Sequence, residues 1–134
     1  MNFTSVNKIF EKSIKENWDR PAISNYQGVT LHYRDLARRI AKLHIMFEEC
    51  GLERGDKVAL CSRNQANWVV SFLAAMTYGA VPVPLMHEFK PSNINHLVNP
   101  FLFQWSLQSI KHQFHLENCN CFHFEINLVK GMAV

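Results

Sequence analysis

Glycine is scarce in this sequence, and its five glycines are spread widely along 134 residues. No run rich in Ser, Thr and Gly occurs anywhere. Loops that hold nucleotide phosphates are typically of this kind, because their backbone N–H groups must approach the phosphate closely. Gly51 and Gly55 are near each other, but no Lys-Ser or Lys-Thr follows them. They therefore indicate a turn rather than a phosphate-binding loop.

Long apolar segments and a disulfide framework are also missing. No apolar run approaches the roughly 20 residues that cross a bilayer, and the N-terminal segment 1–13 is charged where a signal peptide would be apolar. The four cysteines, Cys50, Cys61, Cys119 and Cys121, lack the spacing of a disulfide framework. We therefore predict reduced thiols, no transmembrane segment and a cytoplasmic protein.

Charge is low and scattered. The formal net charge is +3, and the basic residues form no continuous block, so nucleic acid is not predicted as a partner. The pair Arg38-Arg39 could contact a phosphate, but a solvated helix face is the interpretation that we favour.

A cluster of His and Cys side chains lies near the C-terminus. His112, His115, Cys119, Cys121 and His123 could be written as zinc ligands. Their spacing is not one that zinc sites use, and no C-x-x-C pair supports it. Nothing orients a histidine toward a cysteine for catalysis, and no serine lies in a nucleophile elbow. We therefore predict no catalytic, cofactor-binding or metal-binding residue in this chain.

The segment 51–85, GLERGDKVALCSRNQANWVVSFLAAMTYGAVPVPL, is the most informative stretch that is present. It predicts a strand over 57–61, a helix over about 65–78 with Asn64 as its N-cap, and a second strand over 80–85. Gly79 suits the left-handed residue that ends a helix. A strand, a buried helix and a strand with short connections predict a βαβ unit with parallel strands.

Several of these residues resemble the AMP-forming acyl-CoA synthetases, a group of adenylate-forming ligases. The similar elements are Gly-Asp-x-Val-Ala at 55–59, Asn64, Trp68, Phe-Leu-Ala at 72–74 and Gly-Ala-Val-Pro-Val-Pro-Leu at 79–85, with Thr-Leu-His-Tyr-Arg-Asp-Leu upstream at 30–36. The resemblance covers about residues 3–99. It implies the opening part of the large N-terminal domain of a ligase that joins a fatty acid to AMP and then to coenzyme A, with ATP and magnesium as cofactors.

Upstream of this unit the sequence predicts a helix over 3–17 with a stripe of apolar residues, capped by Thr4 or Ser5. Two short strands over 21–24 and 29–33 predict a hairpin in which Gly28 takes the positive φ of the turn. A long helix follows over about 34–50, with Leu36, Ile40, Leu43 and Phe47 on one face. The fold class is therefore α/β, with a β-hairpin and a long helix leading into the βαβ unit.

Downstream, His87 and Glu88 follow a parallel strand, where α/β folds place ligands, although a loop histidine commonly has no such role. A short helix is predicted over 93–99. The resemblance ends at Pro100, and five of the ten phenylalanines lie beyond it. A helix over 103–114 and a strand over 122–129 are conceivable there. We divide the chain into a truncated synthetase segment, 1–99, and an unmatched, poorly specified tail, 100–134, which is either an out-of-frame translation or a specialised C-terminus.

The elements that such ligases use for chemistry are not found. No Ser/Thr/Gly-rich loop ending in lysine occurs in the sequence, and no aromatic-Gly-x-Thr-Glu element occurs either. The segment most similar to the second element is Tyr78-Gly79-Ala80, at the end of a predicted helix. We therefore expect a non-catalytic fragment of a synthetase. The alternative is a small interaction protein that uses its exposed faces to bind a partner or a second copy of itself.

Overall fold

The computed structural model describes residues 5–89, 93, 105–108 and 121–122, and they form the α/β fold that the sequence predicts. The order of helices and strands is α1 (Val6–Glu16), β1 (Pro21–Ser24), β2 (Thr30–His32), α2 (Tyr33–Glu49), β3 (Lys57–Cys61), α3 (Ala66–Tyr78), β4 (Val81–Leu85), β5 (Trp105–Gln108) and β6 (Cys121–Phe122). Strands β1 and β2 pair as an antiparallel hairpin.

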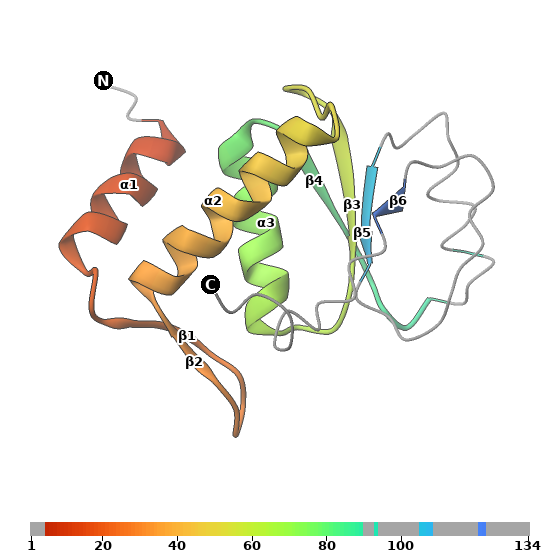
Figure 1. Ribbon diagram of the computed structural model, residues 1–134. Coiled ribbons are helices and arrows are strands. Elements are labelled where there is room, and N and C mark those ends of the chain that lie inside the picture. The colour runs from red at the N-terminus through yellow and green to blue at the C-terminus, as the bar shows by residue number, and fades with distance from the viewer. Residues whose placement is uncertain (1–4, 90–92, 94–104, 109–120, 123–134) are drawn as a thin grey trace.

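The other strands form one sheet in the order β4-β3-β5-β6, and every neighbouring pair is parallel. Cys61 at the end of β3 is level with Leu85 of β4 and Gln108 of β5. Helices α2 and α3 lie on the same side of this sheet, with α1 beyond them (Figure 1). The parallel β3–α3–β4 unit confirms the prediction for segment 57–85.

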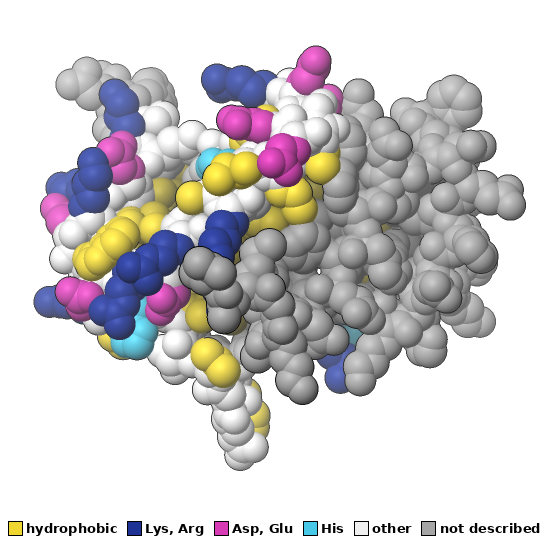
Figure 2. Space-filling view, viewed as in Figure 1, with side chains coloured by type: hydrophobic (Ala, Val, Ile, Leu, Met, Phe, Trp, Pro, Cys, Tyr) yellow, Lys and Arg dark blue, Asp and Glu magenta, His cyan; other side chains and the backbone are white. Residues whose placement is uncertain are grey.

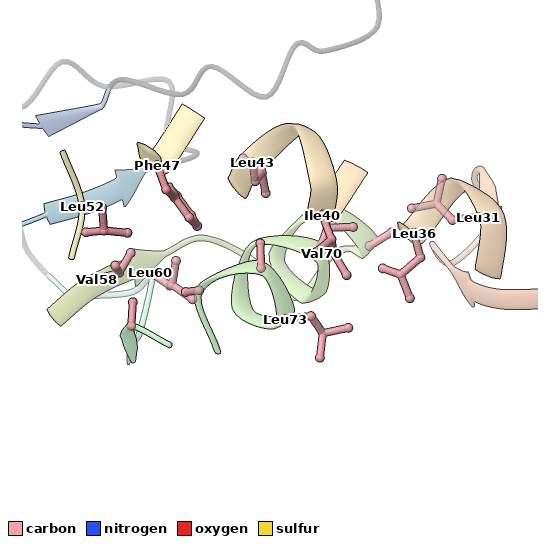
Figure 3. Close-up of a cluster of buried hydrophobic side chains, with 14 residues drawn as sticks. Leu31, Leu36, Ile40, Leu43, Phe47, Leu52, Val58, Leu60, Val70 and Leu73 are labelled. Atoms are coloured by element: carbon pink, nitrogen blue, oxygen red, sulfur yellow. The ribbon is translucent and has the colours of Figure 1, made fainter. Parts of the chain in front are cut away.

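The core forms where α2 and α3 pack on β3. The buried apolar side chains are Leu31, Leu36, Ile40, Leu43, Phe47, Leu52, Val58, Leu60, Ala66, Val70, Leu73, Ala74, Ala75 and Ala80 (Figure 3). The predicted stripe of α2 is thereby confirmed. Strand β3 lies between two neighbouring strands and under the helices, and Val58, Ala59, Leu60 and Cys61 are each only 1% exposed. Burying such side chains is the main source of stability in a domain of this size.

A histidine also joins the two core helices. His44 of α2 places Nε2 3.0 Å from the Ala74 carbonyl oxygen and 3.1 Å from the Thr77 hydroxyl of α3. That hydroxyl donates to the Leu73 carbonyl oxygen at 2.6 Å, so its oxygen can accept from histidine. His44 therefore donates from Nε2 to acceptors on α3, and its role is structural.

The ends of the helices show why the chain turns where it does. Gly51 and Gly79 have φ of 76° and 100°, the left-handed conformation predicted for both helix ends. In the hairpin, Gln27 takes the positive φ of 52°, so the prediction for Gly28 is wrong. Gly28 instead lies close to Asn25, whose Cβ would be 3.0 Å from a Cβ added at the glycine. Glycine is therefore favoured at position 28 because there is no room for a side chain.

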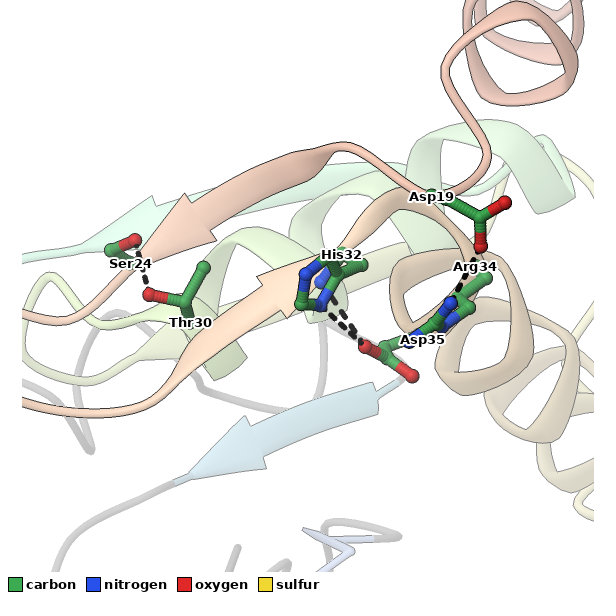
Figure 4. Close-up of polar contacts among 6 residues, drawn as sticks. All are labelled: Asp19, Ser24, Thr30, His32, Arg34 and Asp35. Atoms are coloured by element: carbon green, nitrogen blue, oxygen red, sulfur yellow. Dashed lines mark hydrogen bonds and ion pairs between the residues drawn. The ribbon is translucent and has the colours of Figure 1, made fainter.

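Polar contacts join the two strands of the hairpin to each other and to the start of α2. The Ser24 and Thr30 hydroxyls lie 2.8 Å apart across the hairpin, and the Asp35 carboxylate accepts from the His32 backbone N–H at 3.1 Å (Figure 4). Arg34 forms an ion pair with Asp19. The Asp35 contact lowers the pKa of its carboxyl, because the hydrogen bond from His32 favours the charged form.

Helix α1 is less buried than its sequence predicts. Ser5 accepts from the Lys8 backbone N–H, as expected of its cap, whereas Thr4 lies outside the described residues. Phe10 packs against the core, but Val6 and Ile9 are 51% and 56% exposed. The apolar stripe of α1 is thus only partly covered by the described part of the chain.

The tail also differs from its prediction. Residues 105–108 form β5, which pairs with β3, so a helix across 103–114 is wrong at these positions. Phe122 lies in β6, within the expected strand over 122–129. Of the helix predicted over 93–99, only Asn93 is described, and it is helical. A parallel strand can form here because β3 supplies the partner backbone, which local sequence does not reveal.

Candidate functional site

The strand order marks the place in the sheet where a ligand site is expected. The chain runs from β3 to β4 on one side, and β5 then lies on the other side of β3. The direction of strand addition therefore reverses between β3 and β5. In open parallel sheets, ligands bind outside the carboxyl ends of the strands at such a point. The candidate site is thus the segment after Cys61, beside the end of β5 at Gln108.

Three polar residues follow β3 at this point: Ser62, Arg63 and Asn64. Ser62 is half-buried, and its hydroxyl donates to the Arg63 carbonyl oxygen at 2.8 Å. Arg63 and Asn64 are exposed. These side chains can supply hydrogen bonds and one positive charge, but they contain no carboxylate, imidazole or thiolate that could act as a base. No local pattern in the sequence marks Ser62 and Arg63 as site residues, because only the strand order identifies their position.

The N-terminus of α3 lies directly after this segment and is capped by a distant side chain. The Ala66 backbone N–H donates to Asn25 Oδ1 of the hairpin at 2.8 Å. The residue at the cap position is Gln65, whose side chain makes no capping bond. The prediction of Asn64 as the N-cap is therefore wrong. Because the hairpin already occupies the first amide, and no glycine lies in 62–65, this connection is not a phosphate-binding loop.

The two arginines considered as phosphate ligands behave differently. Arg38 is exposed, in agreement with a solvated face, and Figure 2 shows basic side chains along this side of α2. Arg39 is half-buried and donates to Asn67 Oδ1 of α3 at 2.8 Å. Arg39 therefore joins α2 to the first turn of α3, and the interpretation of the pair as wholly solvated is wrong for this residue.

The structure places His87 and Glu88 after β4, at the carboxyl edge of the sheet, as the sequence predicts. Both are exposed, and no hydrogen bond or ion pair joins either to another described residue. Strand β4 lies on the side of β3 away from β5. His87 and Glu88 therefore lie at the predicted edge but not at the point where the strand order reverses.

Cysteine and metal chemistry find no support in the described residues. Cys50 and Cys61 are free thiols. Burial raises the pKa of the Cys61 thiol, which stays protonated and unreactive at neutral pH. No group of three or more His, Cys, Asp or Glu side chains that could hold a metal ion occurs in the described ranges. Four of the five tail residues considered as zinc ligands lie outside those ranges, and Cys121 lies in β6.

None of the described helices combines the length and the apolar character needed to cross a bilayer.

Comparison with known proteins extends the match seen in the sequence. A family described as AMP-binding enzyme matches residues 10–101. A long-chain-fatty-acid–CoA ligase of Haemophilus influenzae is 29% identical over 107 residues, which are 79% of this chain and 17% of the relative. Surfactin synthase subunit 2 of Bacillus subtilis is 23% identical over 94 residues, 70% of this chain and 3% of the relative.

Solved structures agree on the fold. The N-terminal subdomain of NpsA from Klebsiella oxytoca superposes with a TM-score of 0.77 at 21% identity, over 90% of this chain and 31% of that chain. The present chain thus spans a small part of the length of the relatives that it matches. Its hairpin, α2 and the β3–α3–β4 unit all lie inside the matched residues 10–101.

Proposed function

Because the chain belongs to the family of AMP-binding enzymes, we propose that it forms the opening scaffold of the N-terminal subdomain of an enzyme that activates a carboxylic acid with ATP. The family match over residues 10–101 carries this proposal. It takes in the hairpin, the long helix and the βαβ unit, together with the whole of the buried core described above. The chain would therefore contribute structure to the domain that holds the nucleotide.

The finer assignment is a fatty acid as the substrate. The acid would first attack ATP to give an acyl-adenylate and pyrophosphate, and coenzyme A would then displace AMP to give the thioester. The fatty-acid–CoA ligase relative supports this choice, with higher identity over a longer stretch than the surfactin synthase relative. ATP, magnesium and coenzyme A belong in this proposal to the whole enzyme rather than to the 134 residues. We place the enzyme in the cytoplasm.

Within that enzyme the chain's own residues would have positioning roles. The cap from Asn25 and the bond from Arg39 to Asn67 hold the start of α3 against the hairpin and α2. The start of α3 in turn fixes the segment 62–65 after β3. The chain would set the backbone at the reversal point, while residues elsewhere in the enzyme bind phosphate and perform the reaction.

A non-catalytic interaction module is the second candidate. The observation that favours it is the exposure of large apolar side chains on two helices: Val6 and Ile9 of α1 and Ile45 of α2, the last 56% exposed. Gel filtration separates the two candidates. A discrete dimer of the 134-residue chain would favour the interaction module, and a monomer or an undefined aggregate would favour the scaffold.

A chimera tests the scaffold proposal. Residues 10–101 of this chain would replace the matching segment of the Haemophilus influenzae ligase, and acyl-CoA formation from a long-chain fatty acid would be measured. We expect the chimera to fold and to retain activity, because the family match takes in the buried core that positions the site. The matched control carries Leu60→Asp, which buries a charge in β3 and should abolish folding. A chimera that folds but is inactive would contradict the proposal.

A further inference from the structure

Strand β4 is one end of the parallel sheet and carries an unusual pair of prolines. Among the described residues it pairs with β3 alone, so its other edge faces away from the sheet. Val81 is 46% exposed, and Pro84 is also exposed. An open strand edge presents unpaired N–H and C=O groups, to which the strand of another chain can add.

The register shows which backbone groups face that edge. Val81 donates its backbone N–H to the Asp56 carbonyl oxygen at 2.8 Å, toward β3. Lys57 pairs with Val81 and each later residue with the next, as far as Cys61 with Leu85. Because backbone groups of a strand alternate between its two edges, Val83 and Leu85 also face β3. Residues 82 and 84 face the outer edge.

Both outward-facing residues are prolines, and proline has no backbone N–H. The outer edge from Val81 to Leu85 therefore offers carbonyl oxygens and no donor. A strand that approached it could donate hydrogen bonds but could receive none, and the two rings would crowd its backbone. We propose that Pro82 and Pro84 close the β4 edge to strand addition by a second copy of this chain.

The two prolines remove donors from the outer edge of β4 and leave its pairing with β3 intact. Prolines at 81, 83 or 85 would have removed donors toward β3 and broken the pairing that holds β4 in the sheet. The two-residue spacing of Pro82 and Pro84 keeps every inward donor and removes every outward one. The strand at the opposite end of the sheet, β6, contains no proline. Of the described strands in this sheet, only β4 carries this proline pattern.

The test restores the two donors. Pro82→Val and Pro84→Val would be combined in the full 134-residue chain, and sedimentation equilibrium would compare the variant with the parent at matched concentrations. We expect the weight-average mass of the variant to reach at least twice that of the parent. Hydrogen exchange would show the new amides of residues 82 and 84 to be protected in the associated form. Far-UV circular dichroism establishes that the variant is folded.

Two further variants make the result specific to the edge. Val81→Thr keeps a β-branched residue and adds no outward donor, so it should leave the mass equal to that of the parent. Adding Val81→Lys to the double proline variant should return the mass toward the parent value, because edge lysines oppose strand pairing. The proposal is overturned if the folded double variant has the mass of the parent, or if its new amides exchange as freely as exposed ones.

Discussion

Asn25 joins two parts of the fold that are 41 positions apart in the chain. Its side-chain oxygen accepts from the first amide of α3, and its backbone N–H donates to Val29 across the hairpin. The hairpin thereby orients the helix that follows β3. Asn64, which precedes the helix and has a favourable side chain, is exposed and makes no such bond.

We expect Asn25→Ala to lower the free energy of unfolding by about 1 kcal/mol, the usual value of a helix cap. Urea denaturation with a common slope measures this. Asn64→Ala is the matched control, and it should change stability by only a few tenths of a kcal/mol, as at ordinary surface positions. A larger loss from Asn64→Ala than from Asn25→Ala would contradict the assigned cap.

Asp35 leads to a prediction about pH. Its pKa is lowered, chiefly by the hydrogen bond from His32, so its folded-state value lies below the ordinary value of about 3.9. A carboxyl whose pKa is lowered on folding stabilises the protein above its unfolded pKa, and this stability is lost as the pH falls through the folded pKa. Asp35→Asn should therefore be less stable than the parent at neutral pH, and the difference should shrink on acidification.

Thermal or urea unfolding at a series of pH values measures that difference. Glu49→Gln at the other end of α2 removes the same charge and serves as control. It should not destabilise the protein at neutral pH, because a negative charge near a helix C-terminus is unfavourable. A difference between Asp35→Asn and the parent that is constant with pH would show that the lost stability is not linked to ionisation.

At the scale of elements, β3 is the centre of the core. Leu60 is 1% exposed, whereas Trp68 and Phe72 of α3 are half-buried and stack on each other with ring centres 5.3 Å apart. The sequence predicts a buried helix here, which would place the aromatic Trp68 and Phe72 in the core. Their partial exposure arises because α3 turns Val70, Leu73 and Ala74 toward β3 and α2 instead.

Leu60→Ala should therefore lower the free energy of unfolding by about 2–5 kcal/mol, because it leaves a cavity between packed elements. Phe72→Ala should cost less, since part of its ring is already in contact with solvent. Urea denaturation provides both values. Ile45→Ala, at a side chain that is 56% exposed, is the control and should cost less than either. The central place of β3 would be refuted if Leu60→Ala were no more costly than Ile45→Ala.

At the scale of the whole molecule, β5 ties the C-terminal residues to the core. It is the neighbour of β3 on the side away from β4. The division of the chain into 1–99 and 100–134 remains a prediction, and the pairing of β5 gives a way to test it. We expect a chain ended at Asn99 to unfold at lower urea concentration, because β3 loses a neighbouring strand.

Hydrogen exchange of the β3 amides should be faster in that shortened chain. Leu107→Pro in the full chain is the matched variant, because it disturbs the same ladder without removing residues. If the shortened chain and the proline variant both equal the parent in stability, then residues 100–134 do not contribute to the folded core.

Catalytic activity of the isolated chain is also a property of the whole molecule. The purified 134-residue chain should show no exchange of pyrophosphate into ATP that depends on a carboxylic acid, because no loop in its sequence can hold the phosphates. A mock preparation from the same host without the gene controls for contaminating ligase. Acid-dependent exchange above that control would show that the chain completes a nucleotide site by itself.

The sequence by itself determined the elements whose residues interact with near neighbours. The stripe on α2, the buried β3 and the glycines that end α2 and α3 are local features, since helix and strand periods and left-handed φ depend on adjacent residues. The parallel β3–α3–β4 unit follows from the short connections on either side of a buried helix. The order and spacing of the motifs also indicated the family.

Only the tertiary structure decided the features that depend on distant partners. The cap from Asn25, the Arg39–Asn67 bond and the pairing of β5 with β3 each join residues more than 25 positions apart. Local preference at Asn64, Arg39 and 105–108 indicated other outcomes, and the distant partner prevailed in each case. The position of the candidate site after β3 likewise depends on strand order. Hydrogen bonds between the backbones of distant strands determine that order. Because these backbone groups are the same whatever the side chains, no local sequence pattern encodes the order.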